Sequence, residues 1–343
     1  MQKKLTLKAV AKHLGVSVAT VSNAYNRPDQ LSAGLRQKIL RQCEELGYQG
    51  PNAAARSLRT GRSGIIAILL SDTLEYSFTD PVASQFVQGV AQVLEQHGQD
   101  LLLLSSQHDT QSSSAEAVPD GFILYGVPHS DAQLTRILQQ NKPVVAVDFD
   151  LPGYVSVNID NYKAALQCAL HAMRQRSGKV SVLGLRLIDS DRVCRIQHDE
   201  LYSSDASISR RRLEGYLAAA SQLKRDLPAS QIWQIPKNTL HFARIAAYEA
   251  LSQHPLPSVI LCMSDVIALA ALAAARELGI NIPEQLVVVG FDGIAEGERS
   301  VPTLSTVQQF STDKGRKAAQ KLLNADLTDN EIMPSELIIR QSC

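Results

Sequence analysis

Residues 6–26 read TLKAVAKHLGVSVATVSNAYN, and this stretch predicts two short helices joined by a tight turn. Thr6 can cap the first helix, after which apolar side chains recur at the spacing of one helix face. These apolar residues are Leu7, Val10, Ala11 and Leu14. Gly15 can adopt the left-handed conformation that ends a helix. Ser17 can then cap a second helix, which we expect to span residues 18–25.

A third predicted helix begins behind Ser32 and ends at Gly47. Its expected inward-facing residues are Leu35, Ile39, Leu40, Cys43 and Leu46. Three short helices with a tight turn between the first two form a helix-turn-helix. In such a fold the second helix enters the major groove of DNA.

The second helix carries the side chains that would read DNA. We expect Val21 and Ala24 to face the core. The residues expected to point outward, or to lie near the leading end, are Val18, Ala19, Ser22 and Asn23. Asn23 can read a base edge, most naturally that of adenine, while Val18 and Ala19 can contact thymine methyl groups. Five further residues lie at helix ends, where polar groups meet phosphate: Thr6, Ser17, Thr20, Asn26 and Ser32. A serine or threonine there can equally be a helix cap, and the two roles are compatible.

Charge is distributed unevenly along the chain. The 34 basic and 34 acidic residues cancel over 343 residues, which taken alone predicts no nucleic-acid partner. Residues 1–62, however, contain eleven lysines and arginines against three acids, an excess of eight positive charges. A basic head on an acidic body is typical of a nucleic-acid-binding module fused to a different domain. A solvated basic face would have the same composition.

The head resembles that of the lactose/galactose repressor family of bacterial transcription regulators, and GVSVATVSNAYN at residues 15–26 carries this resemblance. The segment PNAAARSL at residues 51–58 also matches the family's hinge-helix pattern PNxxARxL. The resemblance implies that two hinge helices pair in a dimer and that Leu58 wedges into the minor groove. It implies DNA contacts for three neighbours: Asn52, Ala55 and Arg56. Alternatively, Leu58 packs against the body. Two residues, Gln49 and Gly50, separate Tyr48 from Pro51, where the family usually has one residue. The extra residue can alter the spacing of the DNA half-sites.

From residue 65 onward, short apolar runs alternate with helical patterns. The expected strands are 65–70, 101–104, 121–125, 144–147, 180–183, 232–235, 259–262 and 286–289. The expected helices are 82–97, 131–141, 161–174, 210–223, 240–253, 265–278 and 313–323. This alternation is typical of parallel sheets covered by helices on both faces. The stretches SDVIALAALAAARELGINIPEQLVVVGFDGI (264–294) and VPTLSTVQQ (301–309) resemble the periplasmic-binding-protein-like domain of the same family.

The expected fold class is therefore α/β, with a three-helix helix-turn-helix head, a hinge helix and a two-lobed domain of parallel sheets. The expected domains are a DNA-binding head at 1–49, a hinge helix and linker at 50–62, and an effector-binding and dimerisation domain at 63–343. The resemblance implies that the chain crosses between the lobes near residues 160, 308 and 326. Residues 185–209 are longer and more polar than a simple link requires, and no role is predicted for them.

Ligands of parallel α/β folds bind at the carboxyl ends of the strands. Carboxylates can accept hydrogen bonds from sugar hydroxyls, and arginine can bind oxygen pairs in bidentate fashion. The expected effector-binding residues, partly by resemblance, are Ser71, Asp72, Phe78, Tyr125, Asp148, Arg212, Asn238, Ser264 and Asp292. Two alternatives remain open: Asp265 is a helix N-cap, and Arg212 forms a surface salt bridge. A sugar is the first expected ligand.

Several classes of function are not expected. The five cysteines are scattered without metal-knuckle spacing, so we expect reduced thiols in the cytoplasm, no metal and no cofactor. Neither a signal peptide nor a membrane span is expected. Known catalytic motifs are not found, so an enzyme is not expected.

The sequence therefore predicts a DNA-binding transcriptional regulator, usually a repressor, controlled by a small-molecule effector. A near-palindromic operator and a homodimer are the expected partners, and no tetramerisation tail is expected after the last predicted strand. The alternative is a solute-binding protein of a transport system.

Overall fold

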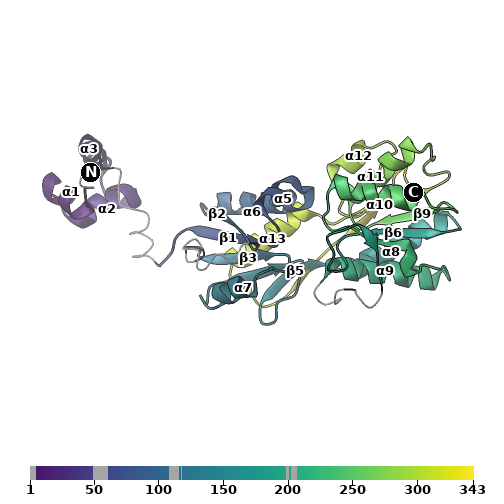
Figure 1. Ribbon diagram of the computed structural model, residues 1–343. Helices are drawn as coiled ribbons and strands as arrows, with labels where there is room; N and C mark the ends of the chain where they lie inside the picture. The colour runs from purple at the N-terminus through teal and green to yellow at the C-terminus, as the bar shows by residue number, and fades with distance from the viewer. Residues whose placement is uncertain (1–4, 49–60, 108–115, 117, 198–200, 202–206) are drawn as a thin grey trace. The chain divides into compact units, whose positions relative to one another are not determined.

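The computed structural model describes residues 5–48, 61–107, 116, 118–197, 201 and 207–343. The predicted hinge residues lie outside these ranges: Asn52, Ala55, Arg56 and Leu58. The chain forms two units, 1–64 and 65–343, whose elements are labelled in Figure 1. Among the described residues, no helix is long and apolar enough to cross a membrane.

The described residues of the first unit form three α-helices that begin behind the predicted caps. They are α1 (Leu7–Leu14), α2 (Val18–Asn26) and α3 (Ala33–Glu45), with a short 3-10 helix at Pro28–Gln30. Thr6 Oγ1 accepts a hydrogen bond from the Ala9 amide at 3.3 Å. Ser17 Oγ accepts one from the Thr20 amide at 2.9 Å. Gly15 adopts a φ of 65°, a conformation that costs glycine little.

A small apolar core joins the three helices. Its buried members are Val10, Ala11, Val21, Ala24, Ile39, Cys43 and Tyr48. Two expectations are wrong. Ser22 is only 6% exposed rather than outward-facing. It lies beside the buried Val21, and the Asn26 side-chain amide donates to both its carbonyl oxygen and its hydroxyl oxygen. Leu35 is 39% exposed rather than inward-facing, because it lies one turn before the first buried residue of α3, Ile39.

The second unit begins with a lobe built on a six-stranded parallel sheet, in the order β12–β5–β4–β3–β1–β2. The strands are β1 (Ile65–Leu70), β2 (Asp100–Ser105), β3 (Gly121–Tyr125), β4 (Val144–Val147), β5 (Val155–Ile159) and β12 (Glu331–Met333). The helices are α5 (Leu74–Thr79), α6 (Pro81–Gln96), α7 (Asp131–Leu138) and α13 (Ser311–Leu323). Alternate residues of β1 enter two separate apolar clusters, as a sheet covered on both faces requires.

The other lobe contains a five-stranded sheet in the order β10–β9–β6–β8–β7, in which only β7 is antiparallel among the described strands. Its strands are β6 (Val180–Gly184), β7 (Cys194–Arg195), β8 (Ile232–Gln234), β9 (Val259–Cys262) and β10 (Val287–Val289). Its α-helices are α8 (Asn161–Gln175), α9 (Ile208–Gln222), α10 (Leu240–Leu251), α11 (Asp265–Glu277) and α12 (Ala295–Arg299), and a 3-10 helix spans Ala229–Gln231. A separate antiparallel pair joins β11 (Thr306–Gln308) to β13 (Glu336–Ile338).

The polar segment 185–209, for which the sequence predicts no role, closes one edge of this second sheet. Within its described part, β7 pairs with β8, and Leu187, Ile188 and Ile196 are buried in the core of the lobe. The described part of the segment is therefore part of the lobe's fold.

The chain crosses between the lobes three times. The first crossing follows β5 at Asp160, and the second follows β11 at residues 309–310. The third was expected near residue 326 but lies at residues 334–335. The reason is that β12 pairs with β5 in the first lobe, and only β13 returns to the second.

Candidate functional site

The predicted DNA-reading residues lie on and around α2. Val18 is 42% exposed and Ala19 is also exposed, while Asn23 is half-buried one turn later on the same side of the helix. Within the described residues, the Asn23 side-chain amide has no hydrogen bond, so it is available to an external partner. Thr6, Ser17 and Ser32 are exposed and cap helices, as predicted. Thr20 and Asn26 are half-buried.

Between the two lobes of the larger unit lies a cleft of about 630 Å³. Seven of the nine predicted effector-binding residues line it: Ser71, Asp72, Tyr125, Asp148, Arg212, Asn238 and Asp292. Ser71, Tyr125 and Asp148 come from the carboxyl ends of β1, β3 and β4. The fold thus gathers residues from both lobes around one space.

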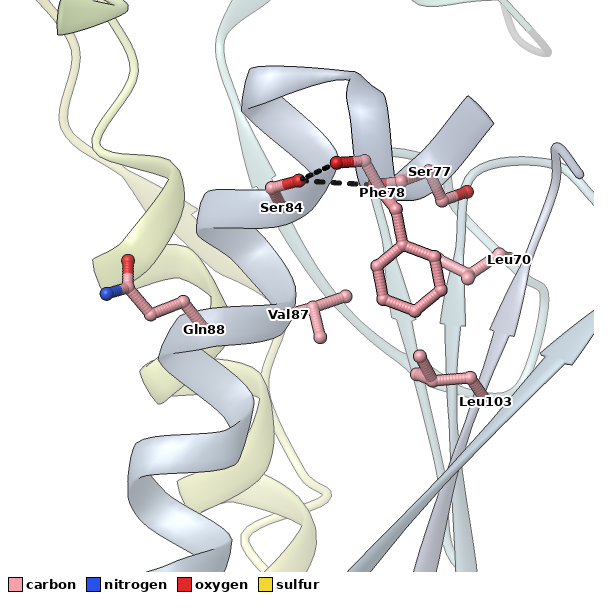
Figure 2. Close-up of a pocket in the computed structure, with 7 residues that line it drawn as sticks. All are labelled: Leu70, Ser77, Phe78, Ser84, Val87, Gln88 and Leu103. Atoms are coloured by element: carbon pink, nitrogen blue, oxygen red, sulfur yellow. Dashed lines mark hydrogen bonds between the residues drawn. The ribbon is translucent and has the colours of Figure 1, made fainter. Parts of the chain in front are cut away.

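Phe78 lies away from this cleft. It is 66% exposed and lines a separate apolar pocket of about 240 Å³ together with Leu70, Val87 and Leu103 (Figure 2). Phe78 belongs to α5, the short helix that follows β1, and its side chain points away from the cleft.

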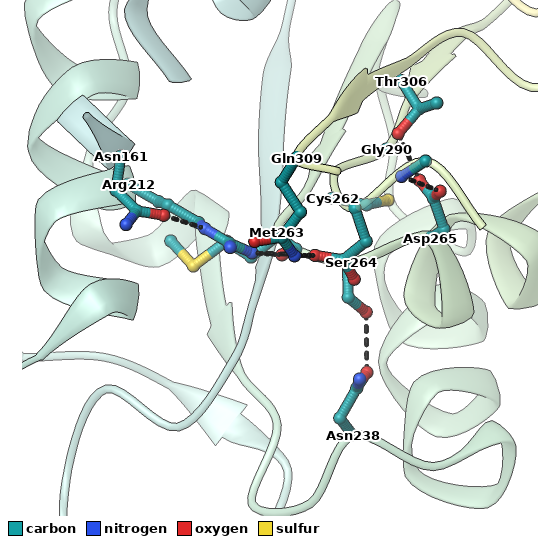
Figure 3. A network of polar contacts seen from close by, with 12 residues as sticks. Asn161, Arg212, Asn238, Cys262, Met263, Ser264, Asp265, Gly290, Thr306 and Gln309 are labelled. Carbon is teal, nitrogen blue, oxygen red and sulfur yellow. Dashed lines mark hydrogen bonds and ion pairs between the residues drawn. The ribbon is translucent and has the colours of Figure 1, made fainter. Parts of the chain in front are cut away.

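Ser264 also lies outside the cleft lining. It is 1% exposed, and its Oγ accepts a hydrogen bond from the Ile267 amide at 3.2 Å, which makes it the cap of α11. The same hydroxyl donates to Asn238 Oδ1 at 2.6 Å (Figure 3). Because Ser264 is the cap, the alternative interpretation of Asp265 as the N-cap is wrong.

A chain of buried polar contacts forms the floor of the cleft. Lys314 Nζ donates to both carboxylate oxygens of Asp148, at 2.7 and 3.0 Å, and to Gln309 Oε1 at 3.1 Å. Gln309 Nε2 donates to Asp292 Oδ1 at 2.8 Å, and Arg212 Nη1 lies 3.4 Å from the same oxygen. The contacts run from the first lobe through the second crossing segment into the second lobe.

Arg212 is held tightly on the second-lobe side. Its side chain is 4% exposed, which excludes the alternative of a surface salt bridge. Its Nε donates to Asn161 Oδ1 at 2.9 Å (Figure 3). Its guanidinium carbon lies 3.6 Å from the centroid of the Phe291 ring. These contacts hold the guanidinium group in place.

A second set of contacts bridges the lobes. Asn238 Nδ2 donates to Asp80 Oδ2 at 3.3 Å, and the Tyr76 hydroxyl donates to the same oxygen at 3.0 Å. Asp80 Oδ1 also caps α6 by accepting the Ala83 amide at 2.9 Å. Asp80-Pro81 is a recognisable start of a helix in the sequence, but nothing there shows that this cap also reaches Asn238.

The sequence analysis missed Asp80, Gln309 and Lys314. Tyr76, Asp80 and Gln309 line the cleft. A lysine within an amphipathic helix normally faces solvent, so the sequence carries no signal for the burial of Lys314, whose side chain is 1% exposed.

Charges around the cleft are largely compensated by their neighbours. Asp148 is paired with Lys314, and Asp292 with Arg212. Arg186, at the cleft wall, lies 2.8 Å from Asp189. Asp72, Asp80 and Lys237 also line the cleft, so acidic and basic side chains are nearly balanced there, and the hydrogen-bonding groups around them suit hydroxyls.

Burial shifts the acid–base behaviour of two cleft carboxyls. It raises the pKa of Asp292 well above its ordinary range, and Arg212 opposes this shift. Burial likewise raises the pKa of Asp72, opposed by His129 and by the hydrogen bond from Ser71. Within the described residues, no group of three or more His, Cys, Asp or Glu side chains could hold a metal ion.

A helix-turn-helix unit followed by a two-lobed α/β unit with a cleft between its lobes defines the class of ligand-responsive DNA-binding regulators. Residues 6–52 match the model of bacterial regulatory proteins of the lacI family, and residues 195–343 match a periplasmic-binding-protein-like domain. A helix-turn-helix transcriptional regulator of Mycobacterium tuberculosis is 35% identical over 98% of this chain and 96% of that relative. The chain belongs to the lacI family of DNA-binding transcriptional regulators.

Two solved structures show the same fold. The lac repressor dimer bound to operator and an anti-inducer aligns with a TM-score of 0.77 and 20% identity, over 99% of both chains. The regulator CelR in complex with cellobiose aligns with a TM-score of 0.67 and 24% identity, over 99% of this chain and 100% of that chain.

Proposed function

We propose that this regulator binds a near-palindromic operator as a homodimer in the cytoplasm and represses transcription under the control of an effector. The observation that carries the proposal is the presence, in one chain, of an exposed DNA-reading helix and a ligand-sized cleft. The lac repressor, which shares the fold, is a dimer bound to operator. The proposal includes DNA contacts by four hinge residues: Asn52, Ala55, Arg56 and Leu58. It assigns no catalysed reaction to the protein. The head disfavours the alternative of a transport protein.

We further propose that the effector is an uncharged sugar or related polyol, bound by the seven predicted residues that line the cleft. The near balance of acidic and basic side chains around the cleft supports a neutral ligand, and Lys237 is the cleft cation that an anionic ligand would have to engage. The solved CelR structure contains cellobiose, an uncharged sugar.

Asn23→Ala is expected to weaken binding to the operator in the gene's own upstream region by about 1–3 kcal/mol, because a base-edge contact is lost. Binding to unrelated DNA, which depends on phosphate contacts, should be unchanged. Gel shifts at fixed salt measure both. Gln37→Ala, which alters an exposed amide on α3, is the control and should leave both affinities unchanged. Equal loss on both DNAs would contradict base reading by Asn23.

Neutral sugars or polyols are expected to stabilise the full chain in a thermal-shift screen. A ligand at 100 times its dissociation constant adds about 2.7 kcal/mol. Asp72→Asn should abolish the shift, because among the described residues this cleft carboxylate binds only the neighbouring Ser71 hydroxyl and is otherwise available to a ligand. Glu75→Gln, on the exposed side of α5, should retain it. Stabilisation by phosphate esters alone would refute the neutral ligand.

A further inference from the structure

Asp292 has an unusual backbone conformation. Its φ is 125°, a region that residues with side chains rarely adopt and that persists only when surrounding contacts enforce it. Two backbone hydrogen bonds flank it: the Asp292 amide donates to the Val307 carbonyl at 2.8 Å, and the Gln309 amide donates to the Asp292 carbonyl at 3.3 Å. This conformation presents the carboxylate to Arg212 and Gln309.

The Asp265 side chain holds the two residues that follow Asp292. This aspartate lies in the first turn of α11 and is 0% exposed. Its Oδ2 accepts the amides of Gly293 and Ile294, at 2.8 and 2.9 Å. Its Oδ1 accepts the Thr306 hydroxyl at 2.5 Å (Figure 3).

The surroundings are shaped to admit this carboxylate. A Cβ atom at residue 290 would lie 2.1 Å from Asp265 Oδ1, so only glycine leaves room for it. Thr306 belongs to β11, which leads into the second crossing segment. One carboxylate therefore ties together α11, the segment after β10 and the strand that carries Gln309 toward the first lobe.

We propose that Asp265 is a positioning residue of the effector site, which holds Asp292 in the conformation that faces Arg212 and Gln309. Asp265 does not line the cleft, and it acts through the two backbone amides that follow Asp292 and through Thr306. The inference rests on the proposed function of the cleft.

The protonation state of Asp265 does not alter this role. Burial raises its pKa to about 7, opposed by the hydrogen bonds from Thr306, Ile294 and Gly293. A protonated carboxyl can keep Oδ2 for both amides and donate from Oδ1 to the Thr306 hydroxyl. Asparagine has the same shape and can do the same through its carbonyl oxygen and NH₂ group. The conservative variant should therefore preserve the positioning.

Amide hydrogen exchange of the full chain without effector, measured residue by residue by NMR, tests the proposal. In Asp265→Ala, exchange should accelerate at least tenfold at Gly293 and Ile294, and also at Asp292 and Gln309. The last two amides have carbonyl acceptors and do not contact Asp265. Asp265→Asn should leave both at wild-type rates. Acceleration confined to Gly293 and Ile294 would overturn the proposal.

Two further variants complete the experiment. Asp160→Ala removes an exposed carboxylate that caps α8 by accepting the Lys163 amide at 2.9 Å, and it should accelerate exchange only near Lys163. Thr306→Val keeps the side-chain shape but removes one anchor of Asp265. If Asp265→Ala does not fold, faster exchange at Asp292 in Thr306→Val supports the proposal, and unchanged exchange overturns it. Because no effector is added, a failure to find one leaves this result intact and bears only on the proposed function.

Discussion

Arg212→Met is expected to lower the free energy of unfolding by about 3–5 kcal/mol, because it leaves the buried Asp292 carboxylate without its cation. The two side chains are 4% and 5% exposed, so water cannot replace the lost partner. The Asn161 side-chain oxygen loses its donor as well. Chemical denaturation of the full chain measures the loss.

The pH dependence of this variant gives a second measurement. Without Arg212, the pKa of Asp292 should rise further above its unfolded value, because burial is then less opposed. A carboxyl with a raised folded pKa favours the fold when it is protonated and loses that contribution as the pH rises through the folded pKa. The deficit relative to wild type should therefore grow with pH once the pH passes the folded pKa of Asp292 in the wild type.

Two variants control this prediction. Arg212→Met combined with Asp292→Asn should recover most of the loss, since the unpaired charge is removed. Arg210→Met, two residues away on α9, breaks a partly exposed pair with Glu214 and should cost no more than about 1 kcal/mol. Equal losses of unfolding free energy for Arg210→Met and Arg212→Met would show that burial of the Arg212–Asp292 pair does not increase its contribution to stability.

Lys314→Met should have an effect of similar size, about 3–5 kcal/mol, on the first-lobe side of the cleft. It removes the cation that binds both oxygens of Asp148, whose side chain is 7% exposed. Gln309 also loses a donor to its carbonyl oxygen. Denaturant titration again measures the change.

The matched control is Lys317→Met on the same helix. Lys317 lies 3.6 Å from Glu331, and both side chains are more than a third exposed, so the expected cost is at most about 1 kcal/mol. Adding Asp148→Asn to Lys314→Met should restore stability, because asparagine tolerates the φ of 64° at this position. No recovery in that double variant would mean that Lys314 contributes through packing.

Local patterns in the sequence predicted the caps of the head and several strands. The bounds of β1, β3, β4 and β9 agree with prediction, because each is a short apolar run bordered by turn residues. The strand β5 was missed, since Ser156 and Asn158 interrupt its apolar run. Both side chains are buried because they hydrogen-bond to Asp150, a contact that periodicity does not reveal.

The candidate site was likewise predictable only in part. Residues at the carboxyl ends of strands could be predicted, because parallel sheets place those ends at one edge. The contacts that organise them could not, because they join distant parts of the chain. Lys314 and Asp148 are 166 residues apart, and Asn238 and Asp80 are 158 apart. Only the packed structure brings such partners together.

The three crossings have a consequence for engineering. Neither lobe is a contiguous piece of the chain, since the first lobe takes α13 and β12 from near the C-terminus. A chimaera that combines this first lobe with the second lobe of a relative therefore needs three junctions, at residue 160, at 309–310 and at 334–335. A nick at any single junction would leave the lobes tethered by the other two.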